Sequence, residues 1–269
     1  MTIRVKKSTG WSGQSISTKK TGLGGRIFTK RTILDGSDAN WVLDPRLSVY
    51  DGGGLVTSIS NPGTLGGTWT PWESNTTYSP SYSASSINGR PGLVFGQDYT
   101  SDVDMISLGK TSLASISKTF YFVYDRGTTS NASGVSANTL VSMNGNNSFI
   151  KRDATYFGST PPDIYWGYSG GYPDVIQPAG TSTPEILVLH SRISGNNWLV
   201  RINGSTIYDG NGNNGPIFSA SDFCVGNDRS SFSRSNQFVG TICWGEFREG
   251  QTDSQVIARE SVIKSYFGI

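Results

Sequence analysis

Residues 198–210 read WLVRINGSTIYDG and place an Asn-Gly pair between two runs that are rich in branched and aromatic side chains. Asn203 and Gly204 readily adopt the positive backbone φ angles that a two-residue type I′ turn needs. Before the turn, Trp198, Val200 and Ile202 point to one side of the chain, and Leu199 and Arg201 point to the other. This alternation is that of a strand whose one face packs on a core. This stretch therefore predicts a tight β-hairpin.

Three further segments show the patterns of strands. Residues 118–125, KTFYFVYD, and residues 185–193, EILVLHSRI, are apolar on both faces, which is typical of central strands that are covered on two sides. Residues 237–250, QFVGTICWGEFREG, alternate more simply. Alternation predicts these same-face groups: Ile186, Val188 and His190; Leu187 and Leu189; Phe238, Gly240, Ile242 and Trp244. Together the segments predict sheets packed in layers.

The composition favours an all-β protein. The 269 residues include 34 Gly, 12 Tyr, 12 Phe and 7 Trp, and only 16% of them are charged. One helix is predicted near the C-terminus, where Thr252 and Gln255 form a capping box and Val256, Ile263 and Phe267 lie near one face. Because β-sandwiches of this length often have one core, a single large β domain is expected.

The sequence indicates neither a membrane protein nor a secreted one. No apolar run approaches the roughly 20 residues that span a bilayer, and residues 1–11 lack the apolar stretch of a signal peptide. Cys224 and Cys243 fall in neighbouring strand-like runs, where a disulfide bond is possible and a pair of buried free thiols is favoured. His190 is the single histidine, which is too few for the usual histidine-rich zinc sites.

The charge is divided unevenly along the chain. Residues 1–31 hold eight of the 22 cationic side chains and no acidic one, which gives this segment a charge of +8. The other 238 residues hold 14 cationic and 20 acidic side chains, a charge of −6. The division predicts a basic arm, residues 1–36, and a body, residues 37–269, with separate roles.

The arm repeats one short pattern. Residues 3–8, 16–21 and 27–32 each read Ile, any residue, Val or Thr, two cations and a hydroxyl. Each copy is expected to be an extended edge strand that needs a partner surface tolerant of cations. The alternative is a flexible basic tail. The predicted contact residues are Ile3, Val5, Lys6, Lys7, Ile16, Lys19, Lys20, Ile27, Lys30 and Arg31.

An acidic protein surface is the preferred partner of the arm. Nucleic acid is disfavoured because the body is net negative and the arm offers only Trp11 and Phe28 to stack on bases.

A glycine-rich stretch in the body gathers aromatic side chains. Residues 163–175 read DIYWGYSGGYPDV. Aromatic rings stack on sugar rings and also anchor protein interfaces. The stretch has three interpretations: cover for a sandwich edge, a subunit contact, or a glycan site. Its candidate residues are Tyr165, Trp166, Tyr168 and Tyr172.

An ordered set of segments resembles a known superfamily. The segments are INGRPGLVF, KTFYFVYD, EILVLHSRI, NNWLVRING, DFCVGND, FVGTICWGEF and VIKSYFGI, and with their connections they cover about residues 40–269. They resemble the concanavalin A-like lectin/glucanase superfamily, in particular laminin-G-like jelly-roll domains. The resemblance implies a two-sheet antiparallel jelly-roll sandwich, to which the extended N-terminal arm and one short C-terminal helix are added. The superfamily includes lectins, glycosidases and structural modules, so the fold leaves function open.

The sequence predicts no catalytic residue, cofactor or metal. Glucanases of this superfamily alternate glutamates and an aspartate along one strand, a pattern that this chain lacks. Glu246 and Glu249 are three residues apart, and His190 lies in an apolar strand without a nucleophile signature. The fold can hold a calcium site, for which Asp98, Asp102 or Asp104 would be the ligands. No loop here has a diagnostic ligand spacing, so a calcium site is a hypothesis and not a prediction.

A basic arm joined to a lectin-like sandwich resembles structural proteins of bacteriophage virions. The main prediction is a head decoration protein or a fibre or other tail appendage, located in the virion and oligomeric. In it the arm docks on capsid or tail proteins and the jelly roll projects outward. The alternative is a host-surface glycan-binding (receptor-binding) module that uses the stretch from Tyr165 to Tyr172. A glycoside hydrolase is the third hypothesis and has the least support.

Overall fold

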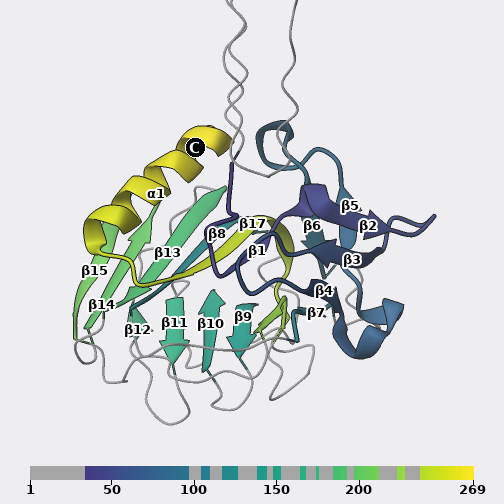
Figure 1. Cartoon of the computed structure of the whole chain (residues 1–269), viewed down its shortest axis with the longest axis horizontal. Helices are drawn as coiled ribbons and strands as arrows, with labels where there is room; N and C mark the ends of the chain where they lie inside the picture. Colours follow the sequence, from purple (N-terminus) through teal and green to yellow (C-terminus); the bar gives the residue numbers. More distant parts are fainter. Residues whose placement is uncertain are drawn as a thin grey trace, which may run out of the picture.

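Two antiparallel sheets packed face to face make up the described part of the chain (Figure 1). The computed structural model describes residues 34–96, 104–109, 117–126, 138–143, 148–152, 164–167, 174–175, 184–192, 197–211, 223–227 and 237–269. A single α-helix within these residues, α1 (Asp253–Phe267), covers the outer face of one sheet. The predicted all-β sandwich with a C-terminal helix is therefore confirmed.

The first sheet lies under the helix. Its strands run in the order β15, β14, β13, β8, β17, β6, β5, and β1 pairs with the C-terminal half of β17. The bounds are β1 (Trp41–Leu43), β5 (Ser81–Ser83), β6 (Gly92–Phe95), β8 (Lys118–Arg126), β13 (Glu185–Ser191), β14 (Asn197–Ile202), β15 (Ser205–Asn211) and β17 (Gly240–Glu249).

The second sheet forms the other layer. Its order is β12, β11, β10, β9, β16, β7, β4, β3, β2. The bounds are β2 (Ser48–Tyr50), β3 (Val56–Ser60), β4 (Thr68–Pro71), β7 (Ile106–Ser107), β9 (Asn138–Met143), β10 (Ser148–Arg152), β11 (Ile164–Gly167), β12 (Asp174–Val175) and β16 (Phe223–Val225). Short 3-10 helices are η1 (Pro45–Leu47), η2 (Trp72–Ser74), η3 (Thr76–Tyr78) and η4 (Ile87–Gly89).

The edges of the two sheets are joined where the start of β3 meets β5. The amide of Val56 donates to the carbonyl of Pro80 (3.0 Å), and the amide of Tyr82 donates to the carbonyl of Gly54 (2.8 Å). Leu55 and Ser81 form a bridge between the same segments. The β2–β3 hairpin is therefore fastened to the edge strand of the first sheet (Figure 1).

Strand β8 shows why the sandwich has two apolar layers. Phe120, Phe122 and Tyr124 pack between the sheets, whereas Tyr121 and Val123 pack under the helix. All five side chains are buried. The prediction that this segment is a central strand covered on both faces is confirmed, because β8 lies between β13 and β17.

Strand β17 departs from the alternation that its sequence predicts. Its pairing with β8 shifts between Ile242 and Trp244, which is a β-bulge. Ile242 lies in the inter-sheet core, while Cys243 and Trp244 both lie in the cluster under the helix. The prediction that Trp244 shares a face with Ile242 is therefore wrong, because the bulge inserts one residue into the repeat.

The terminal helix begins and packs as predicted. Thr252 caps it, and the reciprocal bonds of a capping box with Gln255 are present. Val256, Ile263 and Phe267 are all buried against the first sheet. Within the described residues, no helix combines the length and the apolar character needed to cross a bilayer.

The helix contacts the hairpin that the stretch WLVRINGSTIYDG predicts. Asn203 (φ 50°) and Gly204 (φ 89°) form the turn between β14 and β15. Glu260 of α1 accepts hydrogen bonds from Arg201 Nε (2.6 Å) and from the amide of Gly204 (2.7 Å). Lys264 Nζ donates to the carbonyl of Asn203 (2.7 Å). The turn therefore sets the position of the helix as well as the register of the strands.

Gly204→Ala should lower the free energy of unfolding by about 1 kcal/mol or more, because alanine is strained at this positive φ. A Cβ atom at this position would also lie 2.9 Å from Lys264 Nζ. Urea denaturation measures the change. Gly52→Ala is the matched control, since Gly52 lacks a positive φ and its Cβ would meet nothing within 4 Å. Equal midpoints for the two variants would contradict this account of the turn.

Candidate functional site

Most of the binding residues predicted from the sequence lie outside the described residues. These are the arm residues Ile3, Val5, Lys6, Lys7, Ile16, Lys19, Lys20, Ile27, Lys30 and Arg31, and the loop residues Tyr168 and Tyr172. Tyr165 and Trp166 lie in β11, where Tyr165 is opposite Lys151 and Asp174, and Trp166 is opposite Ile150. The backbone of β11 is thus one strand from the edge of the second sheet. A binding role for these residues stays a prediction.

The described chain starts in contact with the body. Leu34 is buried, and its carbonyl accepts a hydrogen bond from Arg46 (3.2 Å). The carbonyl of Asp35 accepts one from Arg259 of α1 (2.8 Å). The last residues of the predicted arm therefore pack on the sandwich.

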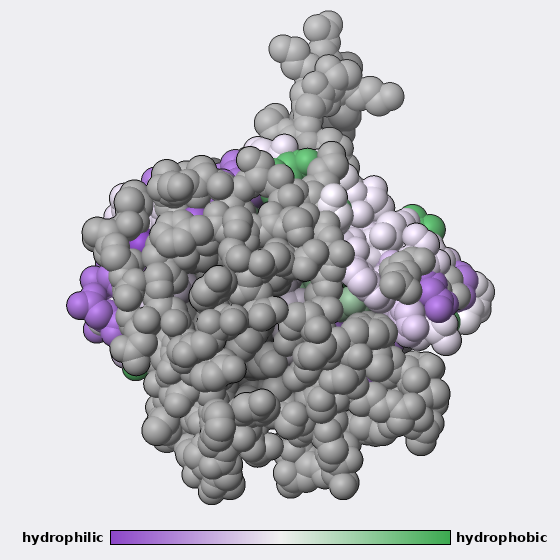
Figure 2. Space-filling view, turned by 90° about the horizontal axis from the view of Figure 1, so that it is seen from below, coloured by the Kyte–Doolittle hydropathy of each residue, from purple (hydrophilic) through white to green (hydrophobic). Residues whose placement is uncertain are grey.

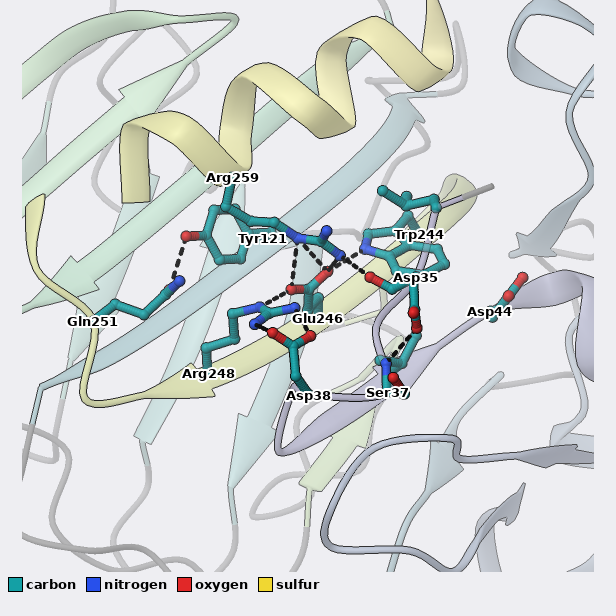
Figure 3. Close-up of polar contacts among 12 residues, drawn as sticks. Asp35, Ser37, Asp38, Asp44, Tyr121, Trp244, Glu246, Arg248, Gln251 and Arg259 are labelled. Carbon is teal, nitrogen blue, oxygen red and sulfur yellow. Dashed lines mark hydrogen bonds and ion pairs between the residues drawn. The ribbon is translucent and has the colours of Figure 1, made fainter. Parts of the chain in front are cut away.

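A group of polar contacts surrounds Glu246 (Figure 3). Its side chain is fully buried in β17. Arg259 of α1 donates to Oε2 (2.6 Å), Arg248 donates to Oε1, and the indole of Trp244 donates to Oε2 (3.0 Å). Arg248 also makes two hydrogen bonds to Asp38 (2.6 and 2.7 Å). Both oxygens of Glu246 are occupied, so this carboxylate stabilises the fold and is not placed to react with a substrate.

The charges of this cluster balance, because Arg248 and Arg259 face the carboxylates of Glu246 and Asp38. The hydrogen bond from Arg248 holds the pKa of Asp38 below its usual value. Burial, followed by the charge of Glu246, raises the pKa of Tyr121, whose hydroxyl donates to Gln251 (2.8 Å). A buried charge is costly unless it is paired in this way.

Glu249 lies outside the buried part of this cluster. Its carboxylate accepts a hydrogen bond from the side chain of Asn40 (3.0 Å), and its amide donates to Asn40 Oδ1 (2.8 Å). Glu246 faces Arg259 while Glu249 faces Asn40, so the two glutamates do not converge on one site.

His190 is buried and belongs to a second chain of polar contacts, which runs from the interior to the surface. Its Nδ1 is 2.8 Å from Thr119 Oγ1, and its Nε2 is 3.4 Å from Asp253. Arg192 holds the same aspartate (2.7 Å) and also Asp209 (2.6 Å). The order of hydroxyl, imidazole and carboxylate is that of a hydrolase triad, but Thr119 is fully buried and no substrate can reach it. His190 is therefore a buried, hydrogen-bonded residue of the apolar strand in which the sequence places it.

The described residues provide no metal site. Asp104 is buried, and its Oδ2 accepts a hydrogen bond from the amide of Gly96 (2.7 Å). Asp98 and Asp102 lie outside the described residues. Elsewhere in the described ranges, no three His, Cys, Asp or Glu side chains cluster as metal ligands would. The calcium hypothesis thus remains untested.

The two cysteines are buried free thiols. Cys224 lies in β16 of the second sheet and Cys243 in β17 of the first. Burial raises the pKa of Cys243 to about 11. The favoured interpretation of this pair is confirmed, and the thiol of Cys243 is a poor nucleophile at neutral pH.

An exposed aromatic pair lies where the edges of the two sheets meet. Tyr50 of β2 stacks on Tyr82 of β5, with ring centroids 4.7 Å apart and ring planes 9° from parallel. Tyr82 packs inward against the inter-sheet core, whereas Tyr50 is 51% exposed and its neighbour Val49 is 59% exposed. We call Tyr50 and Tyr82 the tyrosine platform. The ring of Tyr50 gives it a solvent-exposed aromatic surface.

The turn beside the tyrosine platform is open and polar. Asp51 Oδ1 accepts hydrogen bonds from the amides of Gly53 (2.8 Å) and Leu55 (2.9 Å), which fixes the turn. Gly54 has a φ of 85°, and a Cβ atom on Gly52 or Gly54 would meet nothing within 4 Å. Figure 2 shows the described surface at the end formed by β2–β5 as mostly pale, which marks intermediate hydropathy.

Little in the sequence indicates the tyrosine platform. Tyr50 is the last residue of the three-residue strand β2, and Tyr82 lies between two serines. Neither belongs to an aromatic cluster in the sequence. Their pairing arises only because the β2–β3 hairpin is fastened to β5. Knowledge of the contacts between strands is needed to find it.

Comparison with known proteins identifies the fold. No protein-family model matches the chain, and none of the curated proteins compared with it is similar to it. Among solved structures, the receptor-binding domain of the botulinum neurotoxin C/D mosaic serotype has 12% identity and a TM-score of 0.52 over 83% of this chain and 51% of that chain. The serotype D binding domain has 10% identity and a TM-score of 0.50 over 84% and 52%.

A third similar structure comes from a different class of protein. Domain 4 of AbnA, a GH43 extracellular arabinanase from Geobacillus stearothermophilus in complex with arabinotriose, has 16% identity and a TM-score of 0.49 over 84% of this chain and 100% of that domain. The chain spans about half the length of the toxin domains that it matches. At such identities the toxin matches show the fold alone, and they support the two-sheet sandwich expected from the resemblance.

The stability of the protein should fall as the pH drops from 6.5 to 4. Burial lowers the pKa of His190 to about 4, so the unfolded chain, with its ordinary value of 6.5, binds a proton that the folded chain does not bind in this window. The loss reaches about 3 kcal/mol. Chemical denaturation across this range measures it.

The His190→Gln variant should have a flatter pH profile of stability in the same window. Because His190 is the single histidine, NMR of its ring protons gives an independent readout. A midpoint near pH 6.5 in the folded protein would contradict the prediction.

Proposed function

We propose that this protein is a non-catalytic glycan-binding module and that its ligand stacks on the tyrosine platform. The observation that carries the proposal is the exposed ring of Tyr50, supported from behind by Tyr82. A sugar ring has an apolar C–H face that packs on an aromatic face, while its hydroxyls need polar partners at the rim. The carboxylate of Asp51 and the hydroxyl of Thr57, which donates to the carbonyl of Val49 (3.1 Å), lie in the flanking strands and turn.

Two further observations support a binding role over a catalytic one. Glu246 and His190, the acidic and basic groups for which the sequence disfavours a catalytic role, are buried and bonded within the fold. The toxin structures with this fold are a binding domain and a receptor-binding domain. Recognition of a receptor glycan is therefore the function that this sandwich supports best.

Tyr50→Ala should weaken binding of the full chain to its glycan by about fivefold or more, because loss of the stacking contact removes about 1 kcal/mol or more. Tyr50→Phe keeps the ring and should retain binding. A glycan array identifies the ligand, and calorimetry with that glycan then measures the affinity of each variant.

Val262→Ala is the matched control for the Tyr50 variants, since Val262 is a similarly exposed apolar side chain on α1 (43% exposed). An array without a specific signal would refute the proposal. Equal affinities for the unsubstituted chain and for Tyr50→Ala would refute the placement of the site.

We also propose, as a second candidate, that the protein is a structural component of a bacteriophage virion. The division of charge supports it: residues 1–31 carry +8 and the rest of the chain −6. In this role the arm docks on acidic surfaces of capsid or tail proteins, the chain is oligomeric, and the sandwich projects outward. Glycan binding by the sandwich is compatible with such an attachment.

Removal of residues 1–33 should leave a folded body that no longer enters assembled particles. The cut ends before Leu34, since Leu34 and Asp35 are bonded to the body. Immunoblots of purified particles measure incorporation. A matched variant with Lys6, Lys7, Lys19, Lys20, Lys30 and Arg31 changed to Gln tests whether charge is the cause. Incorporation of the truncated chain at the level of the full chain would overturn this role.

A further inference from the structure

We infer that the tyrosine platform selects uncharged sugars over sialylated, sulfated or phosphorylated ones. This inference rests on the proposed glycan-binding function and adds the chemical class of the ligand. It follows from the charges that surround the tyrosine platform.

The segment that forms the tyrosine platform is almost free of charge. Residues 48–86 contain two charged residues, Asp51 and Glu73, and both are acidic. The rest of the segment is dominated by Ser, Thr, Gly, Pro and aromatic residues. Recognition of a carboxylate, sulfate or phosphate group normally uses Arg or Lys, or the amides of a helix N-terminus. This segment supplies neither Arg nor Lys.

The cations that flank the segment are committed elsewhere. Arg46 pairs with Asp44 (2.6 Å) and lies over the ring of Tyr266 (5.6 Å). Arg90 lies over the same ring (4.1 Å) and donates to the carbonyl of Tyr266 (3.1 Å). Both guanidinium groups therefore hold the C-terminal turn of α1. Their engagement there leaves the tyrosine platform without a cation from the residues next to its segment.

Asp51 is the charged residue nearest in sequence to the tyrosine platform, and it is negative. Asp44 is paired with Arg46 (2.6 Å) and adds no net charge. Asp51 directly follows Tyr50, and its bonds to the turn use Oδ1. Its Oδ2 accepts no hydrogen bond from the described residues, so it can accept bonds from sugar hydroxyls. The same carboxylate repels an anionic substituent.

Paired glycans that differ only by a terminal sialic acid or a sulfate test this inference. The full chain should bind the neutral member of each pair at least about fivefold more tightly at low salt, as expected for one like-charge contact in water. Raising the salt concentration should narrow the difference, because exposed charges are screened.

Two variants distinguish the effect of the Asp51 carboxylate on glycan preference from the effect of the net charge of the protein. Asp51→Asn keeps an oxygen that can accept the turn bonds, and it should raise affinity for the anionic member of the pair about fivefold. Asp209→Asn makes the same change in net charge on β15, at the opposite edge of the first sheet from β5, and should leave the ratio unchanged.

The outcomes distinguish this inference from the proposed function. Equal or tighter binding of the sialylated or sulfated glycan, with loss of binding in Tyr50→Ala, would overturn the inference and leave the glycan-binding function standing. An array on which no glycan is bound would overturn both. The inference is supported if the full chain prefers the neutral glycan. In that case Asp51→Asn should reduce the preference and Asp209→Asn should leave it unchanged.

Discussion

The burial of Glu246 between Arg248 and Arg259 is the interaction on which the arrangement of the molecule depends. It joins the start of the described chain, strand β17 and helix α1. Removing a carboxylate from water costs several kcal/mol, so the cluster is tolerable only when every partner is in place. Its main effect is therefore specificity: a helix displaced along the sheet would leave buried charges unpaired. The pair of Arg201 and Glu260 applies the same constraint at the hairpin.

With the helix fixed, the described part of the first sheet buries apolar side chains on both faces. Its inner side chains meet the second sheet, and its outer ones meet Val256, Ile263 and Phe267. The tyrosine platform lies instead at a sheet edge. There, where β2 approaches β5, an aromatic ring can stay exposed without weakening the core. An exposed aromatic side chain at a sheet edge thus leaves the stable interior of the sandwich undisturbed.

The parts of the fold that sequence reasoning predicts depend on local patterns. Alternation identifies the two faces of β8 and β13, Asn203-Gly204 identifies the hairpin, and Thr252 with Gln255 identifies the start of α1. The face of Trp244 is predicted wrongly because a bulge interrupts the repeat, and a bulge is decided by strand pairing rather than by composition.

The candidate site escapes sequence reasoning for a related reason. The sequence emphasises regions where unusual residues are adjacent, the basic arm and the loop around Tyr165. The tyrosine platform joins single residues from the edges of two sheets, so no local pattern marks it. Glu246 shows the same limit: its spacing from Glu249 speaks against catalysis, but no local pattern indicates that its partner Arg259 lies on the helix that follows.

The start of the described chain is anchored before it enters the sheet. Carbonyls of Leu34 and Asp35 are held by Arg46 and Arg259, and β1 then pairs with β17 in the interior of the first sheet. A mechanical load applied at residue 34 would therefore be resisted first by two arginine side chains and then by the hydrogen bonds between β1 and β17. Tension on this end of the body would reach this pairing before it reached the exposed edge at β2 and β5.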